Sequence, residues 1–139
     1  MSNAYQRRRV LVLEDDAREA RALTRLLEDE GFLVDTVFGG EEALGALARV
    51  HYSPYDLLVL DLKMPGLTGH HVVKFVLHHR RDLLDRVIIT SSSPRREHPE
   101  LGGTAAGRIP WLVKPFHPAE LIRTANALTG TVDPEVVSA

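Results

Sequence analysis

The sequence contains no cysteine, which excludes a disulfide framework, a thiolate zinc site and a cysteine nucleophile. It also lacks a long apolar run: uninterrupted runs such as residues 10–13 reach about four residues, whereas a membrane-spanning helix needs about 20. No positively charged segment followed by an apolar one opens the chain, so no secretory signal is predicted. We therefore expect a soluble, cytoplasmic protein that does not contact the membrane.

Neither sign of charge is in excess. The 17 Lys and Arg residues nearly balance the 19 Asp and Glu residues, and the formal net charge is −2. Binding to nucleic-acid phosphates relies on a clear excess of basic side chains, so no direct nucleic-acid binding is expected. The length of 139 residues suits one domain and is too short for two sizeable cores.

The chain divides into one domain and two ends. Residues 1–7 are polar and include Ser2, Asn3 and Ala4, a pattern typical of the disordered remnant of a cleaved expression tag. Residues 8–129 carry the apolar periodicity of a folded domain. Residues 130–139 are polar with one proline, typical of a tail or the start of a linker.

Short apolar runs alternate along the domain with segments of helical periodicity. Two of the runs are apolar at every position, as a strand buried on both faces requires. This alternation predicts an α/β fold with a doubly wound, five-stranded parallel sheet and flanking helices. The predicted strands cover residues 10–13, 32–34, 57–60, 87–89 and 109–113, and the predicted helices cover residues 17–30, 41–49, 69–81 and 118–128.

The segment at residues 94–107 breaks this pattern. It contains two prolines and three glycines where a further helix would follow the fourth strand. Both residue types disfavour helix interiors, so we expect the fourth helix to be short or irregular.

Polar side chains follow the predicted strands at the points where the strands end. The carboxyl ends of parallel strands meet at one edge of the sheet, so these side chains should lie together. Neighbouring carboxylates repel one another unless a cation joins them, and hard oxygen ligands in an open cleft suit Mg²⁺. The alternative is that each acid merely caps the helix that follows. The residues are Glu14 and Asp15 after the first strand, Asp61 at the third, Thr90 and Ser91 at the fourth, and Lys114 at the fifth.

The same residues carry a resemblance to response-regulator receiver domains, the CheY-like group. The matching motifs are Val-Leu-Val-Leu-Glu-Asp-Asp at 10–16, Asp-Leu-Leu-Val-Leu-Asp-Leu-Lys-Met-Pro-Gly at 56–66 and Lys-Pro-Phe at 114–116. The resemblance covers roughly residues 8–128. It implies the flavodoxin-like fold of that group and a role in two-component signalling. The partner would be a histidine kinase or phosphotransfer protein that supplies a phosphoryl group.

The resemblance also implies a role for each residue of the phosphorylation site. Asp61 would be the phosphoacceptor, a carboxylate nucleophile that forms an aspartyl phosphate. Glu14, Asp15 and Asp61 would hold Mg²⁺ together with the backbone carbonyl of Lys63, with Asp15 the more direct ligand and Glu14 acting through water. Lys114 would place its ammonium near the phosphoryl oxygens.

A hydroxyl and an aromatic ring would report phosphorylation. Ser91 matches the family's switch hydroxyl best, and Thr90 is the alternative. Neighbouring side chains on a strand point to opposite faces, so only one of the two can reach the phosphoryl group. Trp111 would be the aromatic switch residue, or it would simply pack against the core.

Two features depart from the family pattern or lie outside it. Lys63 places a cation two residues after Asp61, and we hypothesise that it alters the lifetime of the aspartyl phosphate. Four histidines at 70, 71, 78 and 79 suggest a metal site, but no carboxylate stands at ligand spacing. We therefore predict that these histidines form a solvated helix face.

Two functions are compatible with these residues, and a third is rejected. The first is a phosphorylation-controlled signalling module that acts on a downstream partner or a linked output domain and is not an enzyme with its own substrate. The second is a degenerate receiver that binds partners without phosphorylation. The third, a phosphatase of the haloacid-dehalogenase type, needs a second acid two residues after the nucleophile, where this chain has Lys63.

Overall fold

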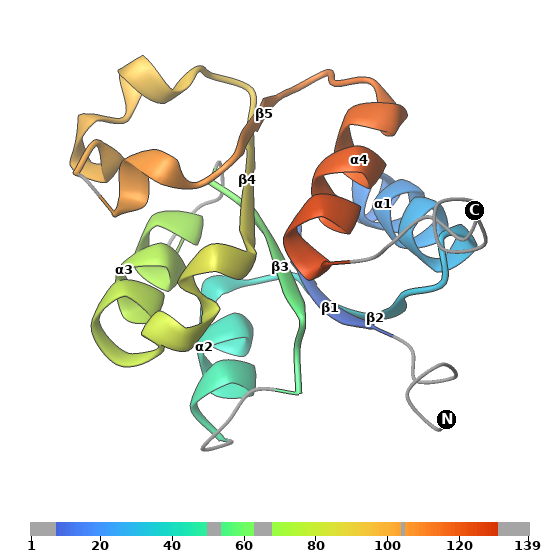
Figure 1. Cartoon of the computed structure of the whole chain (residues 1–139), viewed down its shortest axis with the longest axis horizontal. Helices are drawn as coiled ribbons and strands as arrows, with labels where there is room; N and C mark the ends of the chain where they lie inside the picture. The colour runs from blue at the N-terminus through green and yellow to red at the C-terminus, as the bar shows by residue number, and fades with distance from the viewer. Residues whose placement is uncertain (1–7, 50–53, 63–67, 104, 131–139) are drawn as a thin grey trace.

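The fold is seen in a computed structural model, which describes residues 8–49, 54–62, 68–103 and 105–130. Five parallel strands form one sheet with the order β2-β1-β3-β4-β5, and helices cover both faces (Figure 1). The predicted α/β class and the five-stranded parallel sheet are therefore confirmed. The strands are β1 (Arg9–Leu13), β2 (Leu33–Val37), β3 (Leu57–Asp61), β4 (Val87–Ser91) and β5 (Trp111–Val113).

The fully apolar runs occupy the centre of the sheet. Every residue of β3 and β4 is buried, while the edge strand β2 has no fully buried residue. Strand side chains alternate between the two faces, so each central strand contributes to two separate hydrophobic clusters. One cluster includes Val10, Val12, Leu57, Val59 and Ile88, and the other includes Leu11, Leu13, Leu58, Leu60 and Ile89.

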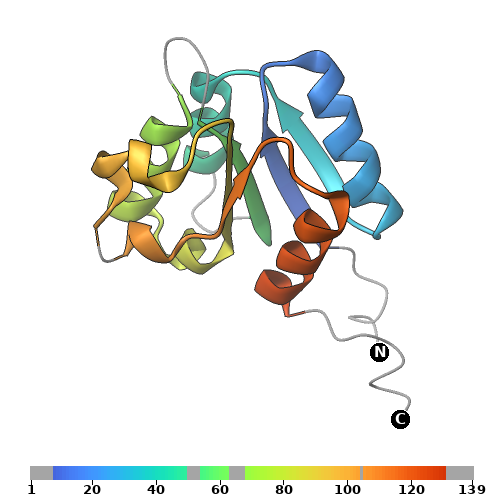
Figure 2. The same ribbon diagram turned by 90° about the horizontal axis from the view of Figure 1, so that it is seen from above.

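Two pairs of helices complete these clusters. Helices α1 (Ala17–Asp29) and α4 (Pro118–Thr129) cover one face of the sheet, and α2 (Gly40–Ala48) and α3 (Gly69–His79) cover the other (Figure 2). Each helix turns its apolar stripe to the sheet, as the helical spacing predicted. Leu23, Leu27, Leu121 and Ala125 pack on the first face, and Ala43, Leu47, Val72 and Val76 on the second.

Strands β2 and β5 differ from their predicted bounds. Strand β2 continues through Asp35 because, at a sheet edge, this carboxylate accepts hydrogen bonds from Arg9 Nη2 at 2.9 Å and Tyr55 Oη at 2.8 Å. Strand β5 begins only at Trp111, since Pro110 has no N–H to donate to the ladder. The carbonyl of Pro110 still accepts from the Ile89 N–H at 2.9 Å.

The segment between β4 and β5 forms no α-helix among its described residues. It contains three short 3₁₀ helices, η3 (Arg95–Glu97), η4 (Pro99–Leu101) and η5 (Ala106–Arg108), drawn in yellow and orange beside β4 and β5 in Figure 1. The expectation of a short or irregular fourth helix is confirmed. Leu101 and Ala106 are buried in the core beside α3 and anchor the segment.

Arg80 follows the C-terminal end of α3 and links helix α2 to the segment after α3. Its side chain is only 8% exposed, donates from Nη1 to the Leu47 carbonyl at 3.1 Å, and holds Asp82 through two hydrogen bonds of 3.0 and 2.8 Å. Arg80→Ala leaves that buried carbonyl without its donor, so we expect the free energy of unfolding to fall by about 1–3 kcal/mol. Urea denaturation would measure this.

The neighbouring Arg81 provides a matched control. It is exposed and donates one 3.2 Å hydrogen bond to the Leu77 carbonyl. Arg81→Ala should change the free energy of unfolding by no more than about 0.5 kcal/mol. Equal losses in the two variants would show that the buried contacts of Arg80 are not what stabilises this corner.

Candidate functional site

Three carboxylates meet at the edge of the sheet where β1 and β3 end. Glu14 directly follows β1 and is buried, Asp61 is the last residue of β3 and is also buried, and Asp15 is exposed. One carboxylate oxygen from each lies within 4.8 Å of the others. The structure therefore brings together the three acids that the strand ends predicted.

Helix capping does not explain these acids. Helix α1 is capped by Asp16, whose Oδ1 accepts the backbone N–H groups of Arg18 and Glu19 at 2.9 Å each. Helix α3, which follows the segment after Asp61, is capped by Thr68. The alternative prediction that each acid caps the next helix is thus wrong for Glu14, Asp15 and Asp61.

Lys114 brings a positive charge into the same pocket. It directly follows β5, and its Nζ lies 2.8 Å from Glu14 Oε1 and 3.5 Å from Asp61 Oδ1. A third carboxylate, Glu19 in the first turn of α1, lies 2.8 Å from the same Nζ. Sequence reasoning missed Glu19; its one-turn spacing from Asp15, at the start of a helix, is the only sequence signal for it.

Burial and like charge set the electrostatics of the pocket. Burial raises the pKa of Glu14 to about 7, against the lowering effect of its hydrogen bond with Lys114, and the charge of Asp61 adds to the rise. Burial acts to lower the pKa of Lys114, but hydrogen bonds to Glu14 and Glu19 and the charge of Asp61 outweigh it and raise that pKa above its usual value. Lys114 is therefore a fixed cation in a pocket where the acids outnumber it.

The pocket is open to solvent. A cavity of about 430 Å³ lies over the strand ends. Gly69, at the start of α3, packs directly against the backbone of Asp61. A Cβ at position 69 would lie 2.4 Å from the Asp61 carbonyl oxygen. The cavity is lined by Glu14, Asp15, Asp16, Glu19, Asp61, Ser92 and Lys114.

The two candidate switch hydroxyls have different surroundings. Ser91 and Thr90 are both buried. Ser91 Oγ lies 3.1 Å from Ser93 Oγ and accepts the Ser93 N–H at 3.1 Å, whereas Thr90 Oγ1 has no hydrogen-bond partner among the described residues. Thr90 is also the register partner of Asp61 across β3 and β4.

Trp111 is linked to Ser91 through Ser93. Its indole N–H donates to the Ser93 carbonyl at 3.0 Å, and its partly buried ring packs against the core cluster beside α3. The ring centroid lies 5.1 Å from that of His98, and the Arg95 guanidinium carbon lies 5.1 Å from the Trp111 centroid. Ser93 and His98 were not singled out from the sequence.

Some of the remaining predictions concern residues that the structure does not describe, and the others concern the four histidines of α3. Lys63 and its backbone carbonyl lie outside the described residues, as do residues 1–7 and 131–139 of the predicted chain ends. His71, His78 and His79 are exposed, as a solvated helix face requires. The same prediction is wrong for His70, which is half-buried and contacts His98 and Glu100 from the segment after β4.

In the part of the chain that the structure describes, no helix combines the length and the apolar character that crossing a bilayer demands.

Comparisons with known proteins agree with this geometry. The chain is 34% identical over 120 residues to the transcriptional regulatory protein ResD of Bacillus subtilis, which covers 86% of the chain and 47% of ResD. The chain thus spans about half the length of the curated relatives that it matches.

Solved structures show the same fold. The chemotaxis protein CheY4 of Vibrio cholerae has a TM-score of 0.72 at 26% identity, over 88% of this chain and 99% of that one. The response regulator TrrA of Thermotoga maritima, solved in complex with Mg²⁺-BeF, has a TM-score of 0.70 at 28% identity, over 87% and 98%. Residues 10–126 match the family model of the response regulator receiver domain, and the chain belongs to that family, with a CheY-like fold.

Proposed function

We propose that the chain is the phosphoacceptor module of a cytoplasmic two-component system and that Asp61 receives a phosphoryl group from a histidine kinase or phosphotransfer protein. One observation carries this proposal. The buried Asp61 carboxylate lines an open acidic cavity, with the Lys114 ammonium 3.5 Å away. Such a carboxylate can act as a nucleophile toward phosphorus. The Lys114 ammonium is already in place to stabilise the negative charge that develops on the phosphoryl oxygens.

The donor set of the pocket fits Mg²⁺. Three carboxylates offer oxygens within 4.8 Å of one another, and the exposed Asp15 leaves room for water ligands, which Mg²⁺ retains. In our proposal Asp61 and Asp15 bind the ion, Glu14 acts through water, and the Lys63 carbonyl completes the set. When bound, Mg²⁺ neutralises charge on the phosphoryl oxygens. The complex of the relative TrrA with Mg²⁺-BeF supports this assignment.

The side chains of this chain divide the work of phosphoryl transfer. An Asp61 oxygen forms the new bond to phosphorus as the bond from phosphorus to the donor's histidine nitrogen breaks, and the electron pair stays with that nitrogen. Lys114 stabilises the charge on the transferred oxygens. Glu14 and Glu19, each 2.8 Å from Nζ, hold the Lys114 side chain over the cavity. Lys63 would then modify the lifetime of the aspartyl phosphate.

The switch would run from Ser91 through Ser93 to Trp111. Movement of the Ser91 hydroxyl toward a phosphoryl group breaks its 3.1 Å contact with Ser93 Oγ. Because the Ser93 carbonyl accepts the Trp111 indole N–H, such a movement changes the surroundings of the Trp111 ring. A downstream protein or a linked output domain would read this change.

Acetyl phosphate tests the proposal on the isolated chain. With Mg²⁺ present, we expect the intact mass to rise by one phosphoryl group and the fluorescence of Trp111, the only tryptophan, to change. Omission of Mg²⁺ should prevent both changes. No gain in mass would favour a degenerate receiver that binds partners without phosphorylation. Sustained turnover of phosphate esters would instead favour an enzyme.

A pair of variants that each remove one hydroxyl identifies the switch residue. Thr90→Val replaces a buried hydroxyl that has no partner among the described residues, so the free energy of unfolding should stay the same or rise by up to about 1 kcal/mol. Its Trp111 response to acetyl phosphate should be retained. Ser91→Ala should accept the phosphoryl group but lose the Trp111 response. The reverse result in the two variants would assign the switch to Thr90.

A further inference from the structure

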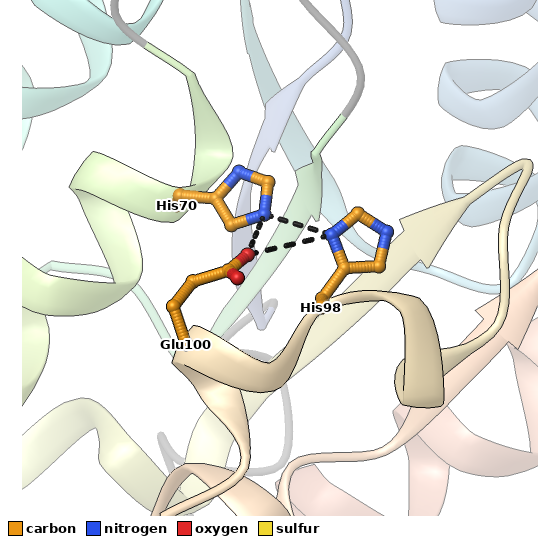
Figure 3. Close-up of side chains that lie close together, drawn as sticks. All are labelled: His70, His98 and Glu100. Atoms are coloured by element: carbon orange, nitrogen blue, oxygen red, sulfur yellow. Dashed lines mark hydrogen bonds and ion pairs between the residues drawn. The ribbon is translucent and has the colours of Figure 1, made fainter.

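Three side chains that the phosphorylation site does not use converge beside α3. His70 lies in the first turn of α3, His98 lies between η3 and η4, and Glu100 lies in η4. Figure 3 shows the two imidazole rings and the carboxylate pointing toward one another. His70 Nε2 is 2.9 Å from His98 Nδ1 and 2.8 Å from Glu100 Oε1, and His98 Nδ1 is 3.6 Å from the same oxygen.

These three atoms are spaced as the ligands of one metal ion are. A triangle with these sides has a circumscribed radius of about 1.8 Å, which is shorter than the ~2.0–2.2 Å bonds that Zn²⁺ makes to nitrogen and oxygen. An ion placed slightly out of the plane therefore reaches all three atoms at bonding distance. The 2.8 and 2.9 Å contacts open by about 0.5 Å to reach the spacing of tetrahedral ligands.

In each ring the inner nitrogen faces the other two side chains, and the outer nitrogen points away from them. Both outer nitrogens are already hydrogen-bonded. His98 Nε2 lies 2.6 Å from Ser93 Oγ, and His70 Nδ1 lies 3.2 Å from Thr68 Oγ1. If the outer nitrogens donate to these hydroxyls, the two inner nitrogens present lone pairs to each other and to the Glu100 carboxylate. Such an arrangement is repulsive until a cation occupies it, and the outer hydrogen bonds are those that orient metal-binding histidines.

The chemistry of the cluster favours a transition metal over Mg²⁺. Imidazole nitrogens suit Zn²⁺, Cu²⁺, Ni²⁺ and Fe²⁺, whereas Mg²⁺ prefers oxygen. Burial lowers the pKa of His70, although Glu100 acts in the opposite direction, and a neutral imidazole is the form that binds metal. Glu100 is 42% exposed, which gives an ion a path from solvent to the half-buried rings.

We propose that His70, His98 and Glu100 form a second cation site, which binds a transition-metal dication of the Zn²⁺ type with its fourth position open to water. The site is distinct from the acidic pocket, since it shares no residue with the Glu14, Asp15 and Asp61 cluster. A bound ion ties the first turn of α3 to the segment between β4 and β5. The His98 ring also packs beside Trp111, which gives binding an optical signal.

Titration with Zn²⁺ and with Co²⁺ tests this proposal. The chain is kept in saturating Mg²⁺, without phosphodonor, so that the acidic pocket is occupied. We expect calorimetry to give one Zn²⁺ per chain, Trp111 fluorescence to change with the same midpoint, and Co²⁺ to produce the visible absorption of a tetrahedral complex. Glu100→Gln and His70→Gln should weaken Zn²⁺ binding by at least about 100-fold, the upper end of what loss of a supporting hydrogen bond costs.

Matched controls separate this site from other histidines and acids. His78→Gln removes an exposed histidine on the same helix, and Asp15→Asn weakens the acidic pocket; both should leave the Zn²⁺ affinity unchanged. Circular dichroism shows whether each variant is folded, and the exposed Glu100 side chain makes Glu100→Gln the least disruptive of them. Absence of Zn²⁺ binding by the wild type, or binding that Asp15→Asn abolishes while Glu100→Gln does not, would overturn the proposal.

Discussion

Asp61→Asn should abolish the gain of a phosphoryl group from acetyl phosphate while leaving the domain folded. The amide is nearly isosteric with the carboxylate but is not a nucleophile toward phosphorus. It also removes one of the charges that raise the pKa of Glu14, so repulsion within the pocket falls. Intact mass after incubation with acetyl phosphate and Mg²⁺ measures acceptance, and a thermal melt followed by circular dichroism reports folding.

A second aspartate of the same cavity provides the control. Asp16 caps α1 through its Oδ1, and asparagine is an equally good N-cap. Asp16→Asn should therefore accept the phosphoryl group at close to the wild-type rate. A mass gain that persists in Asp61→Asn would move the acceptor to Asp15 or Glu14, the other carboxylates of the cluster.

The parts of this site that the sequence predicted share one physical rule. Glu14, Asp15, Asp61 and Lys114 each follow an apolar run, and parallel strands bring their carboxyl ends to one edge. Local periodicity was therefore enough to assemble four side chains spread over 100 residues of chain. The order of the strands decides which neighbours meet, and the structure supplies that order.

The parts that the sequence did not predict depend on contacts without a local pattern. Glu19 contacts Lys114 across 95 positions, and His98 reaches His70 from a segment of short 3₁₀ helices. No periodicity marks which side of such a segment faces the domain. The spacing of the histidines within α3 predicts a solvated face, but it carries no information about the segment beyond β4 that packs over His70.

Lys114→Met should slow phosphoryl acceptance by about 100-fold or more, because removal of one group that stabilises developing charge costs about 10²–10³ in rate. Methionine keeps most of the length of the side chain but places no charge 3.5 Å from Asp61 and 2.8 Å from Glu14. The rate is followed by intact mass after addition of acetyl phosphate and Mg²⁺. Lys74→Met, which removes an exposed lysine from α3, should leave it unchanged.

The same variant should lose stability in a pH-dependent way when Mg²⁺ is removed by a chelator. Loss of one partner of a buried ion pair costs about 3–5 kcal/mol while the other remains charged. The pKa of Glu14 is already raised from 4.5 to about 7, so the folded state holds a proton that the unfolded state releases between these values, and stability falls as the pH rises through them. Without Lys114 the pKa of Glu14 in the folded state rises further, so the stability of the variant continues to fall up to a higher pH. Urea denaturation should therefore show a larger deficit for Lys114→Met at pH 8 than at pH 5, and equal deficits would mean that Glu14 does not depend on Lys114 for its charge.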